Sequence, residues 1–159
     1  MTVNSPDATV LASVVVDASI DIAFSVFTED IGSWWPDEHH LAPTQSMVFE
    51  PRVGGKIYDR LKDGGECRWS TVLAYEPPTR VVFSWAVSPQ WQIETDPDRA
   101  SEVEVHFIAE GDNRTRVELE HRKIDRHGDG WEQTRDAVRS DGGWPLGLRR
   151  FRQRLSSAS

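Results

Sequence analysis

Histidine is the residue type in this sequence best suited to transfer a proton. His121 stands at the end of a predicted strand, on the face that we expect to be covered. An unperturbed histidine titrates near neutrality, so His121 could act as a general acid or base, or bond to a ligand carbonyl. A core histidine with satisfied ring nitrogens is the simpler interpretation. The sequence therefore offers His121 as a candidate without assigning a catalytic residue.

Four potential metal ligands, Asp37, Glu38, His39 and His40, follow one another in a predicted loop at 36–45. Adjacent histidines in a loop rarely face the same ion, and the spacing matches neither a helical nor a finger-type zinc site. We expect no metal and no other cofactor.

Nucleophilic chemistry has little support in the sequence. Cys67 is the single cysteine, which excludes an intrachain disulfide, and no base can be assigned to it. Ser70 and Ser84 lack the glycine pattern of a nucleophile elbow. The pair Gly54-Gly55 precedes a predicted strand rather than a helix, so it indicates a tight turn or bulge and not a phosphate site.

Aromatic residues give the strongest indication of a binding site. The chain has seven Trp, six Phe and two Tyr, and several fall on strands and loops that a curved sheet would bring around one helix. They could line a pocket, with His121, Tyr58 or Arg68 as polar groups, or they could fill an ordinary core. The candidate ligand-binding residues are Trp34, Trp35, Tyr58, Trp69, Phe83, Trp85, Trp91, His121 and Trp144.

Strands are predicted wherever the sequence is β-branched or alternates between apolar and polar residues. The predicted strands are 10–17, 47–50, 56–61, 68–75, 80–87, 102–110 and 115–121. Most of the links between them are short turns, which predicts an antiparallel meander. Alternation in the last two strands places apolar side chains on a covered face and charged side chains on a wet face.

Two short helices are predicted after the first strand. Ser19 is a plausible N-cap for a helix that extends to about Thr28. A second short helix through Ile31 ends before Pro36, because the residue that precedes a proline disfavours the helical conformation.

A longer helical segment at the C-terminus is predicted to cover the sheet. It begins at 129 or 130, is interrupted near 141–143, and restarts with Pro145 at the first helical position. The apolar stripe of the restarted helix consists of Trp144, Leu148, Phe151 and Leu155. The predicted fold is therefore α+β, with a curved antiparallel sheet of six or seven strands wrapped around a long C-terminal helix.

The charge and length of the chain narrow its possible partners. A net charge of −8 argues against nucleic acid and against an anionic membrane surface. No secretory signal or membrane-spanning run is apparent, so we expect a cytoplasmic protein with a disordered segment 1–9 and one domain at 10–156. The wet sheet face is most simply solvated, but it could also be a dimer surface, so monomer and homodimer both stay open. Its acidic residues are Glu102, Glu104, Glu118 and Glu120.

Several short motifs occur in a characteristic order along the chain. They are Trp34-Trp35, the VGGK run at 53–56, the YEPPTRVVFSW run at 75–85 and Gly143-Trp144. This order resembles the START-like superfamily, also called Bet v 1-like or SRPBCC, in the branch of the Hsp90 ATPase activator homologues. The resemblance covers about 10–156 and implies a helix-grip fold.

Within that branch, the chain is similar to the enediyne self-resistance proteins of the calicheamicin type. The shared motifs include the WWP run at 34–36, the FIAEG run at 107–111 and the GWP run at 143–145. Those proteins act by self-sacrifice, in which the diradical of the bound drug takes a hydrogen from a glycine backbone and the chain is cleaved. The resemblance implies that Gly111 would be the sacrificial position.

We predict that the protein binds one hydrophobic or aromatic small molecule between the sheet and the C-terminal helix, without turnover. Three alternatives stay open. The protein could be a self-sacrificing antibiotic-resistance protein cleaved at Gly111, a polyketide cyclase-like enzyme that depends on His121, or an interaction protein similar to Hsp90 co-chaperones.

Overall fold

A computed structural model describes residues 8–36 and 39–157, with side chains described as far as Ser156. Most of the segment predicted to be disordered, residues 1–7, and the pair Asp37 and Glu38 therefore lie outside the described residues. In chain order the elements are β1 (Val10–Val16), α1 (Ile20–Thr28), η2 (Ile31–Ser33), β2 (Thr44–Phe49), β3 (Lys56–Leu61), β4 (Glu66–Glu76), β5 (Arg80–Trp85), η4 (Pro97–Arg99), β6 (Ser101–Gly111), β7 (Arg114–Arg122), η5 (Ile124–His127), α2 (Trp131–Arg139) and α3 (Trp144–Ser157).

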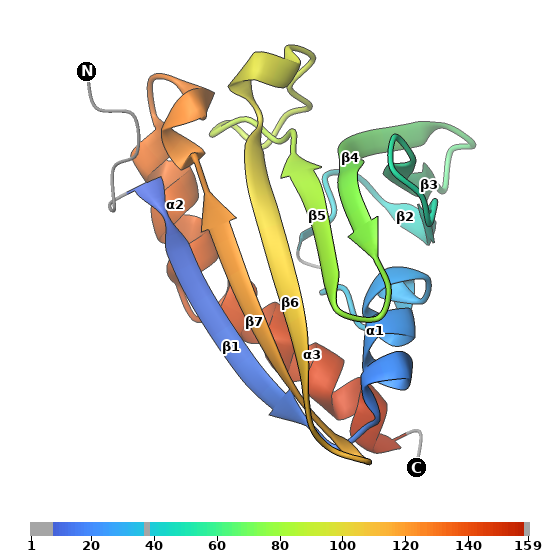
Figure 1. The fold of residues 1–159 in the computed structure, drawn as a ribbon. Coiled ribbons are helices and arrows are strands. Elements are labelled where there is room, and N and C mark those ends of the chain that lie inside the picture. Colours follow the sequence, from blue (N-terminus) through green and yellow to red (C-terminus); the bar gives the residue numbers. More distant parts are fainter. Residues whose placement is uncertain (1–7, 37–38, 158–159) are drawn as a thin grey trace.

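The strands form one curled antiparallel sheet in the order β1-β7-β6-β5-β4-β3-β2 (Figure 1). From β2 to β7 each strand pairs with the next one in the chain, which confirms the predicted meander. The first strand then closes against the last, with Val10 opposite His121 and Val16 opposite Thr115. The predicted covered and wet faces are confirmed, because Val103, Val105 and Phe107 are buried.

Strand boundaries differ most where the sequence lacks alternation. β2 begins at Thr44, three residues before the predicted start, because it pairs with β3 as far as Leu61. β5 ends at Trp85 rather than at 87, because the chain there turns into a loop in which Val87 bridges to Ile93. Both differences lie beside the pocket described below.

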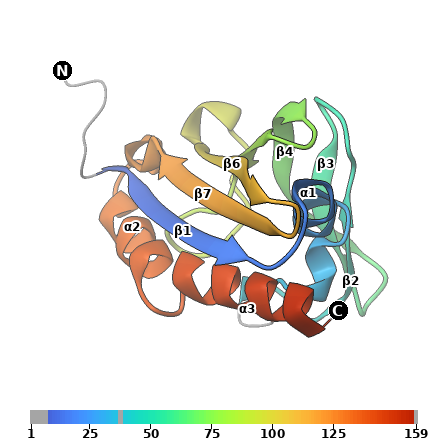
Figure 2. The ribbon, with the colours of Figure 1, turned by 60° about the horizontal axis from the view of Figure 1, so that its bottom comes forward.

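The C-terminal helix lies along one face of the sheet, with α2 leading into it (Figure 2). All four members of its predicted apolar stripe are buried. Pro145 is the second residue of α3 rather than the first, because the helix begins at Trp144. At the other end of the sheet, Ser19 caps α1 as predicted, accepting a hydrogen bond from the Ile22 backbone amide at 3.3 Å. No described helix has the length and apolar character that a membrane crossing requires.

Aromatic rings fill the space between the sheet and α3, where we expected a ligand cavity. Phe27 packs edge-on against Phe151 with ring centroids 5.3 Å apart, and Trp34 lies 5.4 Å from the same ring. Trp34 also donates its indole N–H to the Val26 carbonyl at 3.2 Å. Large buried side chains therefore occupy the space beneath the middle of the sheet, so the predicted cavity between the sheet and the helix has to lie toward the end of the sheet.

The wet face of the sheet is cross-linked by arginines. Arg80 donates to Glu104 at 2.6 Å, and Arg122 donates to the same carboxylate and to Glu102. Burial raises the pKa of Glu104, but the hydrogen bonds from the two arginines outweigh this effect and hold it at about 2. Two of the four acidic residues on this face, Glu102 and Glu104, are therefore paired with arginines of the same chain.

Candidate functional site: an aromatic pocket with a buried histidine relay

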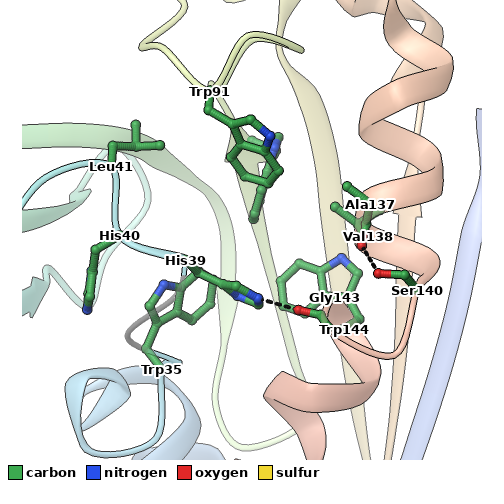
Figure 3. Close-up of a pocket in the computed structure, with 12 residues that line it drawn as sticks. Trp35, His39, His40, Leu41, Trp91, Ala137, Val138, Ser140, Gly143 and Trp144 are labelled. Carbon is green, nitrogen blue, oxygen red and sulfur yellow. Dashed lines mark hydrogen bonds between the residues drawn. The ribbon is translucent and has the colours of Figure 1, made fainter.

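A partly open pocket of about 440 Å³ lies at the end of the sheet where α3 begins (Figure 3). Three separate segments build it: the chain after η2, the loop after β5, and the turn between α2 and α3. Its lining residues are Trp35, His39, His40, Leu41, Trp85, Trp91, Ala137, Val138, Ser140, Gly142, Gly143 and Trp144. The volume falls within the range of small-molecule sites, and the walls are mainly aromatic and aliphatic.

Four mutually packed indoles, which we call the tryptophan cluster, form the wall between this pocket and the core. Its members are Trp35, Trp69, Trp85 and Trp144. Trp35 stacks on Trp69 with centroids 5.1 Å apart, and Trp85 meets Trp144 edge-on at 5.7 Å. Because each ring is held by others, the wall is rigid, which suits the binding of a flat aromatic molecule.

The turn between α2 and α3 is closely packed against the end of α2. A Cβ atom on Gly143 would come within 2.2 Å of the Val138 carbonyl oxygen, so only glycine fits there. The preceding residue, Gly142, accepts a hydrogen bond of 2.6 Å from Nε2 of His39. Figure 3 shows this bond reaching across the pocket, so it joins two of the three segments that form the walls.

His40 lines the same pocket and is bonded to a buried carboxylate. Its Nδ1 lies 2.8 Å from Oδ2 of Asp59, a β3 residue whose exposed fraction is 2%. Thr44 Oγ1 lies 3.3 Å from the same oxygen, whereas Oδ1 of Asp59 has no partner among the described residues. Since a carboxylate only accepts, Nδ1 of His40 carries the proton and Nε2 of the neutral ring is left as an acceptor.

A second polar group, here called the histidine relay, lies behind the tryptophan cluster. Nε2 of His121 is 2.7 Å from Oγ of Ser101, and Nε2 of His127 is 2.8 Å from the same oxygen. Trp144 donates its indole N–H to Nδ1 of His121 at 3.1 Å. All four side chains are buried.

The donors and acceptors of the relay have a single consistent direction. Trp144 can only donate, so Nδ1 of His121 accepts and its Nε2–H donates to Ser101. The Ser101 hydroxyl then donates to Nε2 of His127, whose own proton is left on Nδ1. That Nδ1 has no partner among the described residues. The relay therefore starts at the pocket wall and ends in an unsatisfied donor.

Burial keeps both histidines neutral. Desolvation, with a smaller effect from His127, lowers the pKa of His121 to about 3. Desolvation also lowers the pKa of His127 to about 4, although the nearby Glu94 carboxylate raises it and the Arg99 guanidinium lowers it further. A neutral His121 can hold Trp144 in place at physiological pH, but it is shut off from any ligand by the wall.

The structure divides the predicted site residues into two groups. Trp35, Trp85, Trp91 and Trp144 line the pocket. The others do not: Trp34, Trp69 and Phe83 belong to the core, and His121 belongs to the relay. Tyr58 is buried outside the core cluster, with the Arg68 guanidinium 5.0 Å from its ring centre.

Several polar residues of the site had no assigned role in the sequence. Ser101 and His127 gave no signal. The pairing of β6 with β7 brings Ser101 to His121, and η5 brings His127 to the same serine only after the chain turns at Lys123, which has a left-handed φ of 60°. His39 and His40 were considered only as metal ligands. Asp59 did carry a signal, since a carboxylate that directly follows Ile57 and Tyr58 within a strand needs a partner if it is buried.

The proposed sacrificial glycine lies far from the pocket. Gly111 is in the β6–β7 hairpin, at the end of the sheet opposite α2 (Figure 1). It stands ten residues beyond Ser101 along β6, which at ~3.3 Å per residue corresponds to about 30 Å. A molecule seated in the pocket therefore does not contact Gly111.

Comparison with known proteins identifies the family. The model of the family described as activator of Hsp90 ATPase homolog 1-like protein matches residues 17–156. The chain belongs to this family. No curated protein sequence matches it.

Solved structures include relatives of this AHSA1-like domain with more specific descriptions. The anthrahydroquino-γ-pyrone synthase Txn09 is 40% identical, with 95% of this chain and 100% of that chain covered and a TM-score of 0.67. The self-sacrificing resistance protein CalC from Micromonospora echinospora is 28% identical, with 96% and 97% covered and a TM-score of 0.66. A protein from Mesorhizobium loti shares the fold at 17% identity, with 95% and 98% covered and a TM-score of 0.69.

Proposed function

We propose that the protein binds a planar polycyclic compound of the anthrahydroquinone class in the aromatic pocket and closes a γ-pyrone ring on it. The observation that carries this proposal is the pocket itself, in which packed indoles and two histidines line one partly open volume. The 40% identity to Txn09 over nearly the whole of both chains supports the choice of substrate class. This proposal favours the cyclase alternative over binding without turnover.

The pocket walls suit such a ligand in shape and polarity. Trp35, Trp85 and Trp144 provide flat apolar surface, and Trp91 from the loop after β5 can cover a second face of the ligand. The indole N–H of Trp85 is buried and lacks an acceptor among the described residues. A ligand carbonyl that reaches this N–H would accept a hydrogen bond from it and remove an unsatisfied donor.

The ring closure needs proton transfer and little else. A phenolic oxygen of the hydroquinone attacks a carbonyl carbon in a 1,3-diketone side chain, and the resulting hemiketal loses water to give the pyrone. The phenol must lose a proton, and the departing oxygen must gain one. Histidine is suited to both steps, and the two histidines that line the pocket are His39 and His40.

The test uses a synthetic anthrahydroquinone that carries a 1,3-diketone side chain, kept under anaerobic conditions. Mass spectrometry follows the loss of one water from the substrate, and quenching of tryptophan fluorescence follows binding. We expect the protein to accelerate dehydration at least ~100-fold over the buffer reaction. Binding without acceleration would leave the protein as a carrier of the compound and would exclude the cyclase function.

Self-sacrificing resistance is a second candidate, supported by the 28% identity to CalC over almost the whole chain. It requires a drug bound within reach of the Gly111 backbone. Since Gly111 lies about 30 Å beyond Ser101 along β6, at ~3.3 Å per residue and at the other end of the sheet from the pocket, the drug would have to bind at the hairpin instead. The two candidates therefore use different ends of the sheet and can be separated by experiment.

A further inference from the structure

In the pocket, the titratable side chain of His40 is held by a buried carboxylate, that of Asp59. His40 is contributed by the chain between η2 and β2, and Asp59 by the middle of β3. The 2.8 Å bond between Nδ1 and Oδ2 fixes the ring, while the backbone of β3 is itself paired on both sides with β2 and β4. A base held in this way does not need to be ordered when a substrate binds.

The chemical state of the pair also suits proton transfer. The Asp59 carboxylate has one oxygen bonded to His40 and approached by Thr44, and its other oxygen has no partner among the described residues. A buried carboxylate with spare acceptor capacity favours a positive charge beside it. When His40 takes a proton on Nε2, its ring becomes a positively charged imidazolium. The adjacent Asp59 carboxylate stabilises this charge where it forms.

We propose that His40, oriented by Asp59, is the acid–base group of this pocket, an inference that rests on the proposed function. Nε2 of His40 takes the phenolic proton, and the phenolate oxygen forms the new C–O bond while the carbonyl π pair moves to its oxygen. Protonated His40 returns the proton to that oxygen, giving the hemiketal. Water then leaves with this oxygen and a proton from the diketone carbon, so the net change is loss of one water.

The other histidines are less suitable for this role. His39 donates from Nε2 to the Gly142 carbonyl, and this neutral acceptor stabilises a protonated ring less than the Asp59 carboxylate does beside His40. His121 and His127 are buried behind the tryptophan cluster and bonded to Ser101. His106 is on the wet face of the sheet, 2.7 Å from Glu104.

The decisive variant is His40→Asn. The asparagine amide can still donate to Asp59, because its nitrogen occupies nearly the position of Nδ1, but the base Nε2 is gone. We expect dehydration of the diketone substrate to fall ~100-fold or more with binding changed less than about threefold. His106→Asn is the matched control, since it makes the same substitution outside the pocket, and it should keep the wild-type rate. Circular dichroism confirms that each variant is folded.

Asp59→Asn tests the positioning role of the carboxylate. Without the negative charge, the imidazolium formed during the reaction loses its stabilising neighbour, so kcat per folded active site should fall while KM changes little. A residue that only supports the fold would lower the amount of active protein without changing kcat per active site. An unchanged kcat in a folded variant would overturn the role of Asp59.

A dye that needs no turnover separates this inference from the proposed function. Alizarin is a hydroxyanthraquinone whose visible absorption changes when its phenol ionises. Bound to the wild-type protein, it should ionise about one pH unit lower than when bound to His40→Asn, because His40 can take the proton. Equal ionisation in both proteins would overturn the inference whatever the turnover. A shift without any turnover would support His40 as a proton acceptor and reject the cyclase function.

Discussion

Trp144 donates its indole N–H to Nδ1 of His121 at 3.1 Å, so a pocket-lining residue is fixed by a strand residue that the pocket does not reach. Trp144 is also the first residue of α3, and His121 lies on β7 opposite Val10 of β1. This bond therefore joins the start of the C-terminal helix to the side of the sheet formed by β1 and β7. His121 acts on the site through the position of Trp144.

We expect Trp144→Phe to destabilise the fold by about 1–3 kcal/mol, because it leaves Nδ1 of His121 as a buried acceptor without a donor and removes part of the wall. Urea denaturation at neutral pH measures the change. Trp131→Phe is the control, since the Trp131 ring is only partly buried and packs under Arg135. Equal losses of unfolding free energy in the two variants would show that the hydrogen bond to His121 does not stabilise the fold measurably.

The histidine relay predicts a loss of stability in mild acid. The folded pKa values of His121 and His127, about 3 and about 4, lie below the ordinary value of 6.5, so the unfolded chain binds more protons between these limits. The two neutral histidines contribute fully to the free energy of unfolding above pH 6.5. Their contribution declines as the pH falls, by about 1.4 kcal/mol per pH unit for each histidine. Unfolding free energies measured at pH 7.5, 6 and 5 test this.

The same titration distinguishes the relay from the carboxylates on the wet face. Glu104 has a folded pKa of about 2, so its contribution is retained above the ordinary value of 4.5 and is lost only below it. The slope between pH 6 and 5 therefore belongs to histidines. It should be unchanged in His106→Asn, and a flat profile in the wild type across this interval would contradict the burial of the relay.

Trp91 is expected to contribute to binding more than to stability. Its side chain is 45% exposed at the rim of the pocket, so Trp91→Ala should weaken the binding of alizarin about tenfold with little change in melting temperature. Fluorescence titration measures the affinity for alizarin, and thermal unfolding measures the melting temperature. Leu73→Ala removes a similarly exposed apolar side chain from β4 and should leave the affinity intact. If both variants bind equally well, the ligand does not use this rim.

The position of Gly111 predicts that an activated enediyne bound in the pocket leaves the chain intact at this residue. Intact-mass spectrometry after incubation tests the prediction, with fluorescence to verify that the pocket is occupied. Gly111→Ala is a tolerated comparison, because its Cβ would meet only the Arg114 Cβ, at 3.8 Å. A fragment ending at Gly111 in the wild type and absent in this variant would place the drug at the hairpin and favour resistance.

Most of the fold could be predicted because its signals are local. Alternation along β6 and β7, the Ser19 cap and the apolar stripe of α3 each depend on neighbours within a few residues. The family resemblance covered the same elements and is confirmed by the match at 17–156.

The site could be predicted only in part, because it depends on contacts between distant segments. The bond from His39 to Gly142 joins residues 103 positions apart, and the one from Ser101 to His127 needs the turn at Lys123. Sequence patterns identified Trp35, Trp85 and Trp144 as ligand candidates but could not show that Trp69 and Phe83 would face other rings instead of a cavity. Packing in three dimensions decides which aromatic side chains remain available.

The separation of a solid aromatic interior from a pocket built of loops has an evolutionary consequence. Under the proposed function, substitutions at Trp91 or Leu41 would alter what is recognised without touching the rings around Phe27 and Phe151 in the core. Lineages that carry this scaffold can therefore acquire new chemistries by exchanging rim segments, with their thermal tolerance largely preserved.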